Sequence, residues 1–131
     1  MDADRFPSIE RDGWALVSGE ERHRLHPATF PLPPRSARES LAPGDAAQLI
    51  FDIETREGAR VIDRGIDRMW VIVRSRVGGL YHGVLDSDPG IADGLALRQG
   101  SEVVFSAEHV IAIERPPEGY VLARYGPEFF A

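Results

Sequence analysis

Residues 68–86 read RMWVIVRSRVGGLYHGVLD, and this stretch decides the fold. Two runs rich in β-branched and aromatic residues flank the pair Gly78-Gly79, and such runs favour strands. A Gly-Gly pair suits a two-residue turn of the primed type, in which both central residues need positive φ. The pattern therefore predicts a β-hairpin with one strand over 68–77 and the other over 80–85.

The two-residue turn also sets the register of this hairpin. Val77 then lies opposite Leu80, and Ser75 lies opposite His82, which predicts a buried histidine bonded to a serine. Side chains alternate between the two faces of a strand, so each face can be read from the sequence. The predicted core face carries Met69, Val71, Val73, Ser75 and Val77 with Leu80, His82 and Val84. The predicted second face carries Arg68, Trp70, Ile72, Arg74 and Arg76 with Tyr81, Gly83 and Leu85.

The second face includes an apolar patch of Trp70, Ile72 and Leu85 that needs cover. We expect the cover to be the proline-rich segment, the N-terminal segment, a second protomer or another protein. Trp70 has two interpretations. It is an interface anchor, since Trp is enriched among hot-spot residues, or it is covered by residues 28–34 of the same chain.

The rest of the chain adds short strands and one short helix. Ser18 followed by Glu21 is a capping-box pattern, which predicts a helix of one or two turns that ends before Pro27. Residues 54–67 are charged and predict a long loop or a loose hairpin. Further strands are expected at 14–17, 46–53, 102–105 and within 106–113.

These elements predict a mainly β fold: a small SH3-like or related open barrel of about five strands with one short N-terminal helix. An α+β sheet with a helix on one face is the alternative. We expect a single domain over residues 1–131, because one domain typically has roughly 100–200 residues. Its predicted flanking segments are a loosely ordered arm (1–12), a proline-rich strap (27–43) and a C-terminal tail or strand (116–131).

Composition limits the classes of function. Cysteine is absent, which excludes thiol nucleophiles, thiolate metal sites and disulfides. The net charge of −6 argues against nucleic-acid binding, although all 15 basic residues are arginine. The chain opens without an apolar run and has no apolar stretch of about 18 residues. We therefore expect a cytoplasmic protein with no signal peptide and no membrane contact.

Motifs that carry chemistry are weak in this chain. It contains no phosphate-binding loop, no nucleophile elbow and no zinc-protease helix, so we assign no catalytic residue, metal or cofactor. An enzyme would use Glu108, His109 and the Asp86–Asp88 turn as acid–base groups or metal ligands. A small hydrolase or metal-dependent enzyme is therefore the alternative function. The Asp-Ser-Asp-Pro sequence also suits a plain turn, because Asp and Ser bond to their own backbone.

Several stretches carry a resemblance to a known family, chiefly GWALVSGEER (13–22), LAPGDAAQLIF (41–51) and GSEVVF (100–105). Together with 27–30, 68–71, 83–85 and 108–111, they make residues 13–113 resemble an uncharacterised bacterial domain-of-unknown-function family of small proteins. Ser101 departs from the Gly-Asp pair expected there, which weakens only that turn. The resemblance implies a scaffold without an assigned activity, sometimes encoded near toxin systems. Trp70, Glu108 and His109 are the matching positions that a scaffold explains least.

The aromatic and arginine side chains of the second hairpin face favour binding over catalysis. Arg76 is expected to stack on Tyr81, as guanidinium groups do on aromatic faces. The predicted function is a non-enzymatic module that binds another protein or a second protomer, in an immunity-like or accessory role. The expected partner-binding residues are Trp70, Arg74, Arg76, Tyr81, Glu108 and His109.

Overall fold

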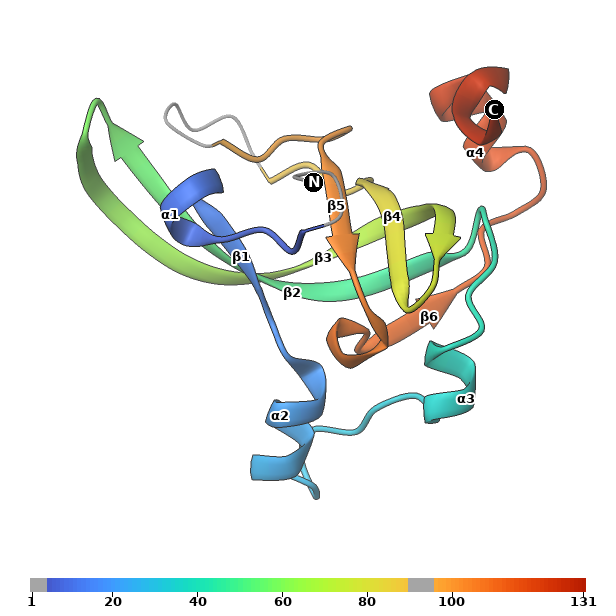
Figure 1. The fold of residues 1–131 in the computed structure, drawn as a ribbon, viewed down its shortest axis with the longest axis horizontal. Coiled ribbons are helices and arrows are strands. Elements are labelled where there is room, and N and C mark those ends of the chain that lie inside the picture. The colour runs from blue at the N-terminus through green and yellow to red at the C-terminus, as the bar shows by residue number, and fades with distance from the viewer. Residues whose placement is uncertain (1–4, 90–95) are drawn as a thin grey trace.

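The sheet curls into an antiparallel half-barrel (Figure 1). Six strands form it within residues 5–89 and 96–131, which are the residues that the computed structural model describes. Their order is β1-β2-β3-β4-β5, and β6 pairs with β2. The predicted mainly β open barrel is thereby confirmed. The strands are β1 (Trp14–Val17), β2 (Ala46–Glu57), β3 (Arg60–Val77), β4 (Leu80–Leu85), β5 (Glu102–Phe105) and β6 (Ala112–Glu114).

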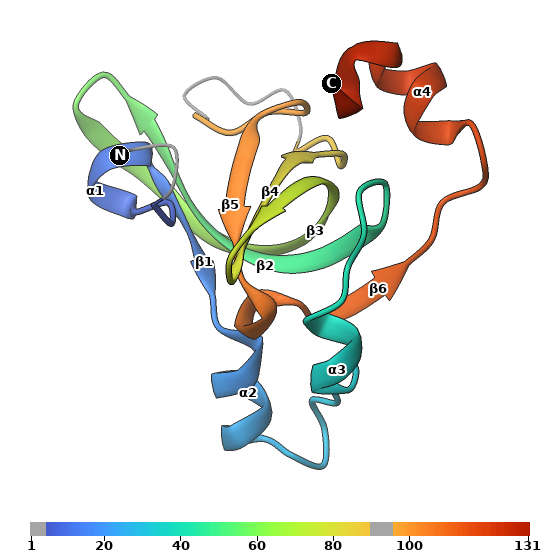
Figure 2. The same cartoon turned by 45° about the vertical axis from the view of Figure 1, so that its right-hand side comes forward.

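Short helices lie on opposite sides of the sheet. In Figures 1 and 2, α2 and α3 are below it, whereas α4 is above it and to one side. None of the helices in the described part of the chain has the length and apolar character that crossing a membrane requires. The helices are α1 (Ile9–Asp12), α2 (Gly19–Leu25), α3 (Arg35–Arg38), η2 (Ala107–His109), α4 (Tyr120–Tyr125) and η3 (Pro127–Phe130).

The predicted N-terminal helix is α2, and it begins at the predicted cap. The Oγ of Ser18 accepts a hydrogen bond from the backbone N–H of Glu21 at 3.1 Å. The Glu21 carboxylate accepts from Arg24 Nε at 3.0 Å, one turn further on. The helix ends at Leu25, two residues before Pro27, as the restriction on residues before proline requires.

The two terminal segments, 1–12 and 116–131, contain more regular structure than the sequence predicted. Within the expected loose arm, α1 forms after Ser8, whose Oγ accepts from the backbone N–H of Arg11. At the other end, α4 forms where a tail or strand was expected. Val121 and Tyr125 lie one helical turn apart there and pack against a face of the sheet, so the segment buries apolar surface without pairing with a strand edge.

The charged segment 54–67 is an extended hairpin and not a long loop. β2 and β3 stay paired from Ala46–Ile72 out to Glu57–Arg60, and Gly58 turns the chain with a φ of 62°. We call the part of this hairpin formed by residues 54–67 the hairpin arm. Figures 1 and 2 show it projecting from the half-barrel. Most of its side chains are exposed on both faces. No alternation of apolar and polar residues therefore marks it in the sequence.

The β3–β4 hairpin keeps its predicted register only near the turn. Val77 pairs with Leu80 and Ser75 pairs with His82, as expected, but a β-bulge between Val73 and Ser75 shifts the remaining pairs by one residue. Because side chains alternate, a one-residue slip moves each partner to the other face. Tyr81 and Leu85 therefore enter the main core, and the predicted core position Val84 belongs to the cluster on the second face. His82 lies two residues before Val84, so it shares that face, and it is half-buried where a buried histidine was expected.

The half-barrel buries two apolar clusters, one on each face of the sheet. The main core fills the concave side, and its largest members include Trp14, Leu49, Phe51, Met69, Val71, Tyr81, Leu85 and Phe105. The second cluster consists of Ala46, Ile72, Val84, Val121 and Phe129, with Trp70, Tyr120 and Tyr125 partly buried beside it. The C-terminal segment thus covers the second face. Cover by residues 28–34 was the wrong prediction, because that strap runs beneath the sheet between α2 and α3.

Candidate functional site

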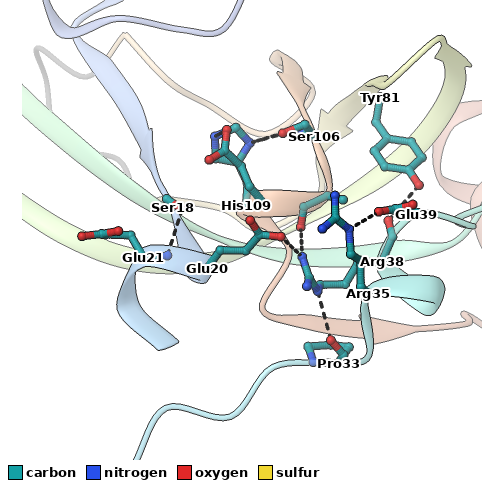
Figure 3. Close-up of polar contacts among 12 residues, drawn as sticks. Ser18, Glu20, Glu21, Pro33, Arg35, Arg38, Glu39, Tyr81, Ser106 and His109 are labelled. Atoms are coloured by element: carbon teal, nitrogen blue, oxygen red, sulfur yellow. Dashed lines mark hydrogen bonds and ion pairs between the residues drawn. The ribbon is translucent and has the colours of Figure 1, made fainter. Parts of the chain in front are cut away.

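A buried arginine organises the lower end of the half-barrel (Figure 3). Only 7% of the Arg38 side chain is exposed. Its Nε donates to the carbonyl of Pro33 at 3.0 Å, and its NH1 donates to Glu20 Oε2 at 2.7 Å and to the carbonyl of Ala107 at 2.8 Å. These bonds join the proline-rich strap, α2 and η2. A buried charge that is paired and hydrogen-bonded in this way fixes geometry, and removing one partner is strongly destabilising.

Tyr81 belongs to the core beside this arginine and is 1% exposed. Its hydroxyl donates to the carbonyl of Arg38 at 2.8 Å and accepts from the backbone N–H of Leu41 at 3.2 Å. Its ring stacks on Phe105 with centroids 5.2 Å apart. The structure thus places this expected partner-binding residue inside the molecule, where it anchors the strap.

The two arginines of the hairpin reach different segments. Arg76 lies over the Tyr81 ring at 5.4 Å, as predicted, and also donates to the carbonyl of Glu39. Arg74 lies over the Phe129 ring at 4.8 Å and donates from Nε to the Phe129 carbonyl at 3.0 Å. Arg74 therefore holds η3 against the sheet.

His109 is buried and caps the short helix η2. Its Nδ1 accepts a hydrogen bond from the backbone N–H of Ser106 at 3.0 Å, so the neutral ring carries its proton on Nε2. Burial lowers the pKa of His109, against the opposing charges of Glu108 and Glu20. Glu108 Oε1 lies 3.7 Å from Nε2. This arrangement gives His109 a structural role.

A shallow pocket of about 340 Å³ at this end brings together three predicted residues: Arg76, Tyr81 and Glu108. Its charges are largely compensated within the chain. Glu20 pairs with Arg38, and Glu39 pairs with Arg35. A ligand there would compete with existing ion pairs, so the pocket is a weak candidate for a site.

Trp70 lines a different cleft, of about 240 Å³, which we call the Trp70 cleft. The backbone N–H of Trp70 donates to Ser87 Oγ at 2.9 Å, and its carbonyl accepts from the N–H of Asp86 at 2.8 Å. The side chain is half-buried. The cleft is lined by Ala46, Trp70, Ile72, Asp86, Ser87, Glu114, Pro116, Pro117 and Tyr120.

Asp86 fixes the far wall of this cleft by binding α4. Its carboxylate accepts from the hydroxyl of Tyr120 at 2.7 Å, from the hydroxyl of Tyr125, and from Arg124 Nε at 2.8 Å. The hydrogen bond to Asp86 raises the pKa of Tyr120, and burial raises the pKa of Tyr125. Both phenols therefore stay protonated and continue to donate at neutral pH. The carboxylate of Asp86 serves as an attachment point for the C-terminal helix.

The structure does not bring the enzyme candidates into one site. Asp86 binds α4, whereas Glu108 and His109 lie in η2 beside α2 and α3, on the other side of the sheet (Figures 1 and 2). Across residues 5–89 and 96–131, no group of three or more acidic or histidine side chains is arranged to hold a metal ion.

Sequence reasoning missed Glu114 and Tyr120, which form the cleft together with Trp70. The segment 116–131 carried a signal for the helix that contains Tyr120, whereas Glu114 lies before that segment and joins the cleft only through the fold. Val121 and Tyr125 have helical spacing, and Gly126 follows at the position where glycine commonly ends a helix. A helix read from that pattern offers an apolar face for the bare patch around Trp70.

No protein-family model matches this chain, and neither the curated proteins nor the solved structures contain a significant match. The resemblance to a bacterial family of unknown function therefore stays a prediction.

Proposed function

We propose that this chain is a non-enzymatic module that binds another protein, and that the Trp70 cleft is its contact site. One observation carries the proposal. The C-terminal segment packs with Ile72 and Val84, which are 1% and 3% exposed, but leaves Trp70 half-buried at the wall of an open cleft. A large aromatic side chain placed in this way resembles the anchors that dominate protein interfaces.

The size of the cleft favours a protein partner over a small-molecule substrate. Pockets for drug-sized ligands typically measure about 300–1,000 Å³, and the Trp70 cleft measures about 240 Å³ with an open mouth. It suits one side chain of a partner, with the surrounding surface supplying the remaining contacts.

The cleft is also held rigid before any partner arrives. Ser87 and Asp86 fix the backbone of Trp70 from one side, and the Asp86 carboxylate fixes Tyr120 on the other. Rigid walls reduce the entropy that binding must remove, which increases affinity. An immunity-like or accessory role is part of the proposal and follows from the family resemblance, and a cytoplasmic location is part of it because the sequence shows no signal-peptide pattern.

The alternative, a small hydrolase or metal-dependent enzyme, has no such observation in its favour. Its proposed groups lie on different sides of the sheet, and His109 Nδ1 is already occupied by the Ser106 N–H.

The test is partner capture from a lysate of the cells that express the protein, followed by titration of the purified components. Trp70→Ala removes the anchor, and Val77→Ala, at a residue that is 65% exposed beside the hairpin turn, is the matched control. We expect wild type and Val77→Ala to capture the same protein in a one-to-one complex. Binding by Trp70→Ala should be weaker by a factor of about 30 or more, since hot-spot losses are at least about 2 kcal/mol.

Circular dichroism first establishes that each variant is folded, and Trp70→Phe replaces Trp70→Ala if the latter is not. Capture that is equal for wild type and the folded Trp70 variant contradicts the proposed site. The absence of any captured protein with one-to-one binding contradicts the proposed function.

A further inference from the structure

We infer that the Trp70 cleft accepts a single arginine side chain of the partner protein. This inference rests on the proposed function and specifies the chemistry of the partner. The first support is charge. Two carboxylates, Asp86 and Glu114, line the cleft, and none of its lining residues is basic, although the chain has 15 arginines.

The second support is that Glu114 is available. Asp86 is bound by Tyr120, Tyr125 and Arg124. Glu114 is exposed at the end of β6, and its carboxylate forms no hydrogen bond or ion pair within residues 5–89 and 96–131. A carboxylate without a partner beside an apolar wall is suited to receive a cation from outside.

The third support comes from the other aromatic rings of the chain. Four arginines of the described residues lie over an aromatic ring, on Phe30, Phe129, Tyr81 and Tyr125. Neither Trp70 nor Tyr120 receives such a contact in that part of the chain. Trp offers the best face for a cation, so the cleft presents the strongest such ring without an internal cation.

The arrangement favours arginine over lysine. A guanidinium is planar, stacks on an aromatic face and binds a carboxylate through two parallel N–H groups. In the cleft, the indole of Trp70 provides the face, Glu114 provides the carboxylate, and Pro116 and Pro117 provide an apolar wall for the methylene stem. A lysine ammonium uses only the charge and keeps more of its hydration.

The experiment is an NMR titration of the indole N–H groups with capped tripeptides. The chain has two tryptophans, and Trp14 is a core residue that is 7% exposed, so its indole signal is an internal control. The probes are acetyl-Gly-Arg-Gly-amide, the same peptide with citrulline, which is the neutral near-isostere of arginine, and the same peptide with lysine. Glu114→Gln removes the available carboxylate, and Glu118→Gln is the control at a neighbouring exposed glutamate.

We expect the arginine peptide to shift the Trp70 signal saturably, with a dissociation constant on the order of 1 mM for so small a contact. The Trp14 signal should stay in place. Citrulline, lysine and the Glu114→Gln variant should each bind about tenfold more weakly, because each loses the charge-assisted bidentate contact. Glu118→Gln should bind like wild type.

Equal binding of the citrulline peptide overturns the inference and leaves an apolar contact site, so the proposed function survives that result. Equal binding of the lysine peptide overturns the preference for arginine. If no probe shifts Trp70, the cleft is not an arginine site, and the capture experiment then decides the proposed function independently.

Discussion

Gly83 lies at a close approach of β4 to β3. A Cβ at this position would be 2.4 Å from the carbonyl oxygen of Ile72 and 2.7 Å from Cγ1 of Val71. Atoms of these types do not approach so closely, and a backbone oxygen cannot move aside as a flexible side chain can. The bulge next to Arg74 therefore depends on a missing side chain on the opposite strand.

We expect Gly83→Ala to lower the free energy of unfolding by about 2 kcal/mol or more, as overpacking of a filled site does. Gly65→Ala is the matched control, because Gly65 lies in β3, the strand that pairs with β4. It has no positive φ and has open space around its Cβ position. Urea denaturation of the three proteins measures the difference. Equal stability of Gly83→Ala and wild type contradicts the close packing at the bulge.

His109 performs a function that a different residue type usually has. The third position of a capping box normally carries Glu or Gln, whose side chain reaches back to the backbone N–H of the cap. Here the Nδ1 of His109 does this for Ser106. The protein thereby places a titratable group inside a helix cap.

We expect His109→Gln to fold and to be less sensitive to acid than wild type. Burial lowers the pKa of His109 below its ordinary 6.5 in the folded protein, so the unfolded state binds more protons as the pH falls below 6.5. The contribution of neutral His109 to stability is therefore complete above pH 6.5 and declines below it. Glutamine keeps a hydrogen-bond acceptor and does not titrate.

Urea denaturation at pH 7.5 and at pH 5.0 tests this expectation. The loss of unfolding free energy between the two pH values should be smaller in His109→Gln than in wild type. An identical loss in both proteins shows that His109 does not contribute to the acid sensitivity.

The hairpin arm shows how one element protects an open strand edge. Residues 60–67 repeat a four-residue pattern, RVID followed by RGID. β3 pairs with β2 along this stretch, whereas β4 pairs with β3 only from Val71 onward, so the other edge carries no strand in the described part of the chain. The aspartates that end each repeat, Asp63 and Asp67, accept the backbone N–H of the following arginine at 2.9 Å.

We expect the double variant Asp63→Ala/Asp67→Ala to self-associate. It frees two N–H groups on an edge whose side chains Val61, Ile62 and Ile66 are 44%, 48% and 53% exposed, and such edges pair with other chains. Light scattering against protein concentration measures the effect.

The control for the double variant in the hairpin arm is Glu57→Ala/Glu118→Ala, at two exposed glutamates. Both double variants remove two negative charges and change the net charge from −6 to −4. Equal scattering by the two variants assigns any association to charge alone and rejects the protective role of Asp63 and Asp67.

At the scale of the hairpin, the sequence predicts the position of the turn and the first pairs correctly, because Gly78-Gly79 determines them locally. The sequence also predicts positive φ at both glycines, whereas of these two only Gly78 has one, at 61°. It cannot predict the bulge, which depends on the close approach of Gly83 to β3 in three dimensions. The same limit applies to the candidate site. Trp70 was identifiable as an apolar residue needing cover, whereas Glu114 and Tyr120 join it only through the fold.

The whole molecule consists of one curled sheet with separate apolar clusters on its two faces. The main cluster includes no residue after Ile113 among its described members, and the second depends on Val121 and Phe129. Arg74 and Asp86 hold this cover in place through contacts with Phe129 and with α4. The two faces should therefore respond differently to loss of the C-terminal segment.

We expect deletion of residues 116–131 to leave the half-barrel folded and to expose the second face. The far-ultraviolet circular dichroism should keep its β character, because the main cluster is untouched. Binding of the dye ANS should increase strongly, as it does when apolar surface becomes accessible. Complete loss of the β signal contradicts the independence of the two clusters.

The position of this cover along the chain has a consequence for biosynthesis. Translation proceeds from the N-terminal side, so residues 116–131 emerge from the ribosome after every residue that they cover. Until then, the nascent protein presents Trp70, Ile72 and Val84 to the cell without protection. Transiently exposed apolar surface makes incomplete chains prone to aggregate. We therefore expect a chain that ends just before residue 116 to hold its barrel and to expose the apolar surface that chaperones recognise.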